Sequence, residues 1–147
     1  MIHDNCLKEH QISIQDNEFL QLFLATELRV EDFNHRAHLK IGYCLICQYD
    51  VDMACTKIKS GILNLLEHIG QGKEKYHETI TKAWILAIHY FMRTSRPSIS
   101  FQQFIEQNPI LLDQGIMYTH YSHHLLQSEL AKSKYLEPDL ETIPIHC

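Results

Sequence analysis

The chain has few of the residues that break helices and lacks the pattern that builds a sheet. Its 147 residues include only five glycines and four prolines, and no run rich in valine and threonine alternates with polar residues. Such alternation is what a half-buried strand requires, so a sheet is not expected. Apolar residues recur instead at helical spacing, which predicts an all-α fold.

Long apolar runs and an excess of positive charge are also missing. No stretch approaches the roughly 18 apolar residues that span a bilayer. The polar segment from Met1 to Gln15 lacks the apolar centre of a signal peptide. The formal net charge is −5 and no basic patch stands out, so neither a membrane nor a nucleic acid is an expected partner. A cytoplasmic protein is the prediction that follows.

The chain also lacks an even number of cysteines: it has five, so they cannot all form pairs. That count argues against a disulfide framework. Cys44 and Cys47 form a C-x-x-C motif, but they fall in the middle of an expected helix. A redox cysteine sits at a helix N-terminus, where the dipole lowers its pKa. With no second such motif to make a zinc ribbon, we predict that both cysteines serve packing.

The length fits one domain with its own core. We expect a single-domain helical bundle of about five to seven helices, with an N-terminal extension over residues 1–15 and an extended tail over residues 137–147. Asp16 and Asn34 are the expected N-caps of the first two helices. The expected helices run from Asp16 to Leu24, from Asn34 to Gln48, from just after Asp52 to near Gly70, from Glu74 to Arg93 and from Ser100 to Gln107, with short helices up to Tyr135.

Three of the eleven histidines are predicted to point into the core. On a helical wheel, His35 and His38 share the apolar face of their helix, and Gly42 leaves room there for a neighbour or a ligand. His77 shares the apolar face of the helix expected from Glu74. Burying three imidazoles together is costly unless something binds them, and a divalent metal is the commonest such group. Six others are expected at the surface: His3, His10, His68, His123, His124 and His146.

Three histidines with one open position are the ligand set of a catalytic zinc, iron or copper centre. The i, i+3 spacing of His35 and His38 would let them share one ion with His77. Glu78 lies on the flank of its helix and is the expected acid/base or a group that orients a ligand. His120 is the reserve fourth ligand. Alternatively, each histidine is a core residue bonded to a backbone carbonyl or to a tyrosine.

Two functions therefore stay open. One is a metal-dependent enzyme acting on a small molecule, with His35, His38 and His77 as ligands and Glu78 as the catalytic group. The other is a metal-free helical module that binds a small ligand or a protein partner through the histidines. The sequence leaves the metal, the substrate and the oligomeric state open, a homo-oligomer included.

Two segments also carry a resemblance. Residues 33–39 read Phe-Asn-His-Arg-Ala-His-Leu, and residues 76–81 read Tyr-His-Glu-Thr-Ile-Thr. Through these motifs the chain resembles a widespread family of small helical bacterial proteins, largely of unknown function. The resemblance extends over roughly residues 19 to 144 and includes Glu-Pro-Asp-Leu at residues 137–140. It implies no particular activity, and relatives tend to have a longer loop before the second motif.

Overall fold

The computed structural model describes residues 9–144, and this part of the chain is helical without strands. Its elements are α2 (Ile14–Leu24), η1 (Val30–Asp32), α3 (His35–Gln48), α4 (Val51–His68), η2 (Lys73–Lys75), α5 (Glu78–Thr94), α6 (Phe101–Gln107), η3 (Pro109–Leu112), η4 (Gln114–Thr119), α7 (His123–Leu126) and α8 (Glu129–Ser133), where η marks a 3₁₀-helix. The predicted all-α bundle is confirmed. Over the same residues, no helix combines the length and the apolar character that a bilayer crossing requires.

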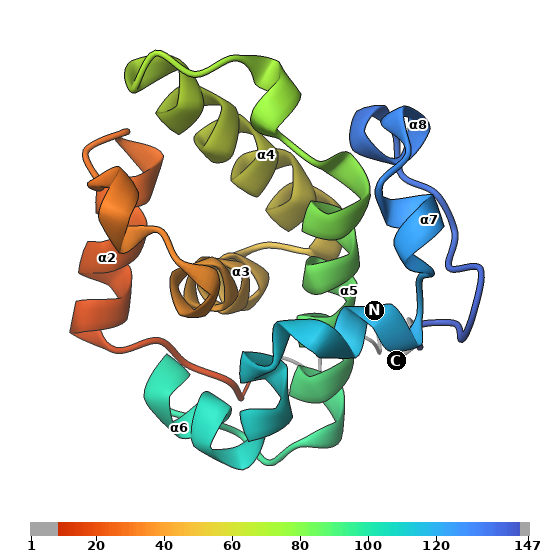
Figure 1. Cartoon of the computed structure of the whole chain (residues 1–147). Coiled ribbons are helices and arrows are strands. Elements are labelled where there is room, and N and C mark those ends of the chain that lie inside the picture. Colours follow the sequence, from red (N-terminus) through yellow and green to blue (C-terminus); the bar gives the residue numbers. More distant parts are fainter. Residues whose placement is uncertain (1–8, 145–147) are drawn as a thin grey trace.

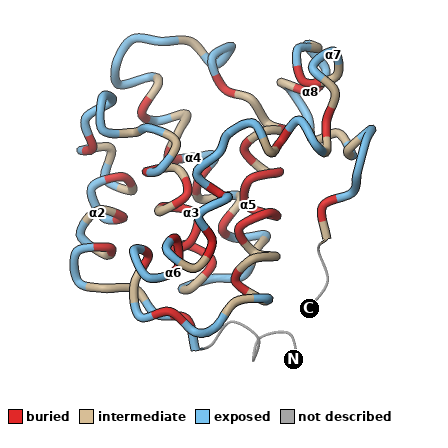
Figure 2. The backbone as a smooth tube through the Cα atoms, turned by 60° about the horizontal axis from the view of Figure 1, so that its bottom comes forward, coloured by how far each residue is buried: buried red, intermediate tan, exposed pale blue. Residues whose placement is uncertain are grey.

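Helix α3 lies at the centre of the bundle, with α2, α4, α5 and α6 around it (Figure 1). Its residues from Ile41 to Ile46 are all buried, so it is apolar on every side at mid-length, as a central helix must be. Buried positions gather on α3 and α5, which face each other (Figure 2). A Cβ on Gly42 would lie 2.7 Å from the Ile88 side chain, so this glycine permits the close approach of the two helices.

Side-chain caps set where the first helices begin. The predicted bounds of α3 are confirmed, since Asn34 Oδ1 accepts a hydrogen bond from the backbone N–H of Ala37 at 2.8 Å. The predicted cap of α2 was wrong. Ser13 is the N-cap, and Asp16 is the third helical residue, whose carboxylate accepts from the Ser13 N–H at 2.9 Å. The two residues form a capping box.

The segment before α2 is packed rather than free. His10, expected at the surface, is buried, so that prediction was wrong. Its Nε2 lies 2.6 Å from the carbonyl oxygen of Met92, and its Nδ1 accepts from the Ser98 N–H at 3.2 Å. Burial lowers the pKa of His10. His68, His123 and His124 are exposed as predicted, whereas His3 and His146 lie outside the described residues.

The largest correction concerns α5. The helix was expected from Glu74, but a 3₁₀ turn occupies Lys73–Lys75 and α5 begins at Glu78. His77 is its N-cap, with Nδ1 accepting from the Ile80 N–H at 3.1 Å. Histidine is not among the common cap residues, so common capping rules do not predict this start.

The cysteines agree with the predicted packing role. Cys44, Cys47 and Cys55 are free thiols, and Cys44 is fully buried. Burial raises the pKa of Cys47 to about 12 and that of Cys55 to about 11. Neither thiol therefore has the thiolate character of a redox cysteine at neutral pH.

The close contact of α2 with α4 predicts that a larger residue at Gly61 would strongly reduce stability. A Cβ at this position would overlap the ring of Phe23, a fully buried side chain of α2. We expect Gly61→Ala to lower the free energy of unfolding by about 1–3 kcal/mol, because the core would be overpacked. Ser60→Ala, on the exposed side of the same helix, is the control and should change stability by less than about 0.5 kcal/mol. Equal urea midpoints for the two variants would contradict this account of the contact.

Candidate functional site

A cleft of about 350 Å³ opens between the start of α3, the first turns of α5 and the outer segment η4–α7. Its volume lies in the range of small-molecule sites. Both sequence motifs contribute to it. The lining residues are Phe33, Asn34, His35, His38, Ile80, Trp84, Gln114, Met117, Tyr118 and Leu126.

His35 is the first residue of α3 and joins this helix to η3. Its Nε2 lies 2.9 Å from the carbonyl oxygen of Leu111, so Nε2 must carry the hydrogen and donate it. The ring also meets Trp84 edge-on, with 4.7 Å between the ring centroids. One nitrogen of His35 is thus used to hold the neighbouring segment, while the ring forms part of the cleft wall.

His38 lies one turn further along α3 and has an unusual environment. Its side chain lines the cleft, yet its Nε2 is buried and has no hydrogen-bond partner. Burial, and secondarily the nearby His35, lower the pKa of His38 to about 4, so the ring is neutral at pH 7. A buried polar atom without a partner costs about 1–3 kcal/mol. Because Nε2 is shielded, a polar group held in the cleft supplies the missing partner only after the ring turns Nε2 toward it.

His77 does not present a free nitrogen beside the other two. Its Nε2 donates to the carbonyl oxygen of Leu126 at 2.7 Å, and its Nδ1 accepts from the Ile80 N–H. A metal ligand needs a free nitrogen lone pair, which His77 has only if the cap of α5 is broken. Within residues 9–144, no three His, Cys, Asp or Glu side chains are grouped so that they could hold one ion.

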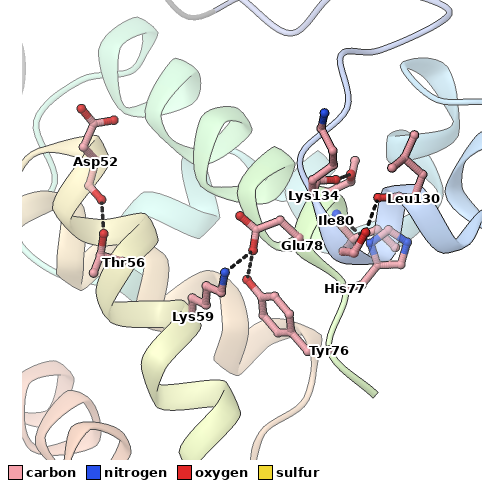
Figure 3. Close-up of polar contacts among 11 residues, drawn as sticks. Asp52, Thr56, Lys59, Tyr76, His77, Glu78, Ile80, Leu130 and Lys134 are labelled. Carbon is pink, nitrogen blue, oxygen red and sulfur yellow. Dashed lines mark hydrogen bonds and ion pairs between the residues drawn. The ribbon is translucent and has the colours of Figure 1, made fainter. Parts of the chain in front are cut away.

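Glu78 points away from His77 and toward α4 (Figure 3). Its Oε1 lies 3.3 Å from Nζ of Lys59 and accepts from the Tyr76 hydroxyl at 2.9 Å. It therefore joins α4 to α5 and does not line the cleft, and its catalytic role stays a prediction. His120, the reserve ligand, is also elsewhere, since its Nδ1 lies 2.7 Å from the carbonyl oxygen of Glu141.

The cleft has no charged side chain in its lining. Its polar side-chain groups are the two imidazoles, the Tyr118 hydroxyl, the Trp84 indole N–H and the amides of Asn34 and Gln114. Burial of an ion without a counter-charge is unfavourable, so this lining suits an uncharged ligand. The three lining residues of η4 were missed from the sequence, because a 3₁₀-helix has no periodic pattern to reveal its inward face.

No protein-family model, curated protein or solved structure matches the chain. The resemblance to small bacterial helical proteins therefore stays a prediction. The case for a function depends on the cleft itself.

The lowered pKa of His38 leads to a prediction about pH. Its pKa of about 4 in the folded chain lies below the usual 6.5, so the folded state binds this proton less tightly than the unfolded state. This group leaves the free energy of unfolding unchanged above pH 6.5 and lowers it by roughly 3 kcal/mol as the pH falls to about 4, because the unfolded state takes up the proton first. The free energy of unfolding, measured with urea, should decrease less between pH 7 and pH 4 for His38→Leu than for wild type.

His10 contributes in the same direction, because its pKa is also lowered. The comparison of variants is therefore made at each pH rather than on wild type alone. The ring signals of His38 in ¹H–¹⁵N spectra should move only near pH 4. A midpoint between pH 6 and pH 7 would show that the ring is not desolvated.

Proposed function

We propose that this chain binds a small, uncharged, planar aromatic molecule in the cleft, and that His38 forms a hydrogen bond to its hydroxyl group. The observation that carries the proposal is the unpartnered Nε2 of a neutral imidazole in a largely apolar cleft. A neutral imidazole nitrogen is a donor in one tautomer and an acceptor in the other. A hydroxyl group can do either, so it satisfies both.

The ring content of the cleft supports a planar ligand. Aromatic or imidazole rings make up half of the lining: Phe33, His35, His38, Trp84 and Tyr118. Two of these rings also stack on a ring outside the cleft lining. Phe33 stacks on Phe23 at a centroid distance of 5.5 Å, and Tyr118 stacks on His123 at 3.7 Å with an angle of 4°. Side chains fixed before binding lose little freedom when a ligand arrives.

The metal-dependent enzyme is the second candidate, with zinc, iron or copper held by His35, His38 and His77. The hydrogen bonds of His77 favour ligand binding over this alternative, because coordination through either ring nitrogen would require His77 to give up its bond to Ile80. A cytoplasmic location belongs to the same proposal and is supported by three free cysteines. Membership of the bacterial family is supported by the meeting of both motifs at the cleft.

A matched pair of ligands tests the hydroxyl contact. We expect wild type to bind 4-hydroxybenzamide about tenfold more tightly than benzamide, since one hydrogen bond is worth about 1–1.5 kcal/mol. In His38→Leu this difference should vanish. Dissociation constants come from titrations followed by NMR shifts of the cleft residues. Equal affinities in wild type, or an undiminished preference in the variant, would contradict the role of His38.

Unfolding of the ligand-free protein is the control. His38→Leu removes an unpartnered polar atom, so its thermal midpoint should equal or exceed that of wild type. His10→Leu removes a ring whose two nitrogens both have partners, so it should cost about 1–3 kcal/mol. An equal loss of stability in both variants would mean that the His38 ring has a hydrogen-bond partner within the fold.

Metal analysis separates the two candidate functions. For protein purified without a histidine tag, the proposal expects well under one equivalent of zinc, iron or copper, and a thermal midpoint that a chelator does not change. One equivalent of metal that is absent from both His38→Leu and His77→Asn would establish the metal centre instead.

A further inference from the structure

His77 does not line the cleft, but its ring is bonded to two residues that do. Its Nδ1 accepts from the N–H of Ile80 on α5, and its Nε2 donates to the carbonyl oxygen of Leu126 on α7. Figure 3 shows the His77 ring beside Ile80, on the side of α5 away from Glu78. Because an imidazole is rigid, the two bonds fix the separation of these two walls.

His35 makes a corresponding bond to Leu111, which lies before η4 and α7 in the chain. Its Nε2–H donates to the carbonyl oxygen of Leu111. The segment between these two anchor points, residues 112–125, is called here the outer wall. It carries the lining residues Gln114, Met117 and Tyr118. Each end of the outer wall is thus held to the bundle by one histidine.

We propose that His77 is a positioning residue, which holds the outer wall at the separation from α5 that ligand binding requires. The ligand is the one proposed above, so this inference depends on that function. His77 acts through the backbone of Ile80 and Leu126 and does not touch the ligand. Its part in the Tyr-His-Glu-Thr motif is therefore to shape the cleft rather than to bind a metal.

The bonds of His77 define the form of the ring that is needed. Nδ1 must keep its lone pair toward the Ile80 N–H, and Nε2 must carry the hydrogen toward Leu126. Only one neutral tautomer does both. Among other side chains, asparagine can supply the capping acceptor but is too short to reach Leu126. His77→Asn therefore keeps the helix cap and removes the bond to the outer wall.

The experiment combines hydrogen exchange with ligand affinity. In His77→Asn, we expect the amides of residues 114–126 to exchange about tenfold faster, while those of α3 and α4 keep their wild-type rates. The dissociation constant for 4-hydroxybenzamide should rise about tenfold, since only a fraction of molecules then has the wall in place. His77→Ser, a second capping variant, should behave alike.

Asp50→Ala is the matched control. Asp50 caps α4, where its Oδ1 accepts from the Met53 N–H at 2.7 Å, and it is remote from the cleft lining. Its loss should speed exchange at the start of α4 and leave the affinity for 4-hydroxybenzamide unchanged. This variant shows what the loss of a helix cap does when no wall of the cleft is involved.

Two results of the exchange experiment would overturn the inference. One is wild-type exchange of residues 114–126 in both His77 variants. The other is faster exchange throughout α3 and α4 as well, which would make His77 a support of the whole fold. An unchanged dissociation constant, measured with a probe that wild type binds, also contradicts it. If wild type binds no probe while the wall alone exchanges faster in His77→Asn, the positioning role stands and the proposed ligand is what fails.

Discussion

Neutral imidazole rings that bridge backbone groups hold the separate segments of this fold together. His10 joins the segment before α2 to the end of α5 through Met92, and to the loop after α5 through Ser98. His77 joins α5 to α7 in the same way. A neutral imidazole has one donor and one acceptor on opposite sides of a flat ring, so it can satisfy two buried backbone groups that secondary structure leaves unpaired.

This constraint explains why His38 differs from the other core histidines. A ring with two backbone partners contributes to stability, and His10 and His77 are of this kind. In His38, Nε2 is buried and has no such partner, and its lowered pKa results mainly from that desolvation. Polar groups that are costly to bury are more common at ligand-binding and catalytic sites than at positions that serve packing alone.

The sequence was sufficient for α3, whose start follows a common capping rule. Asn34 predicted the start of α3, and the wheel of that helix placed His35 and His38 on one side, where both reach the cleft. The wheel failed for His77, because it assumed a helix through residues 74–77, where the chain forms a 3₁₀ turn and then a cap. The partners of His10 and His77 are mostly backbone groups, and these leave no mark in the sequence. The inward side chains of η4 depend on packing between distant segments, which local patterns do not encode.

The bonds that anchor the outer wall have a consequence for the order in which the molecule is assembled. They connect residues 76 and 49 positions apart, whereas the helices that they join form from local contacts. Closing long loops costs more entropy than forming local turns, so we expect the individual helices to form before the wall docks. We therefore expect the cleft to be completed late in folding. A ligand bound in the cleft would accordingly stabilise the docked wall against opening.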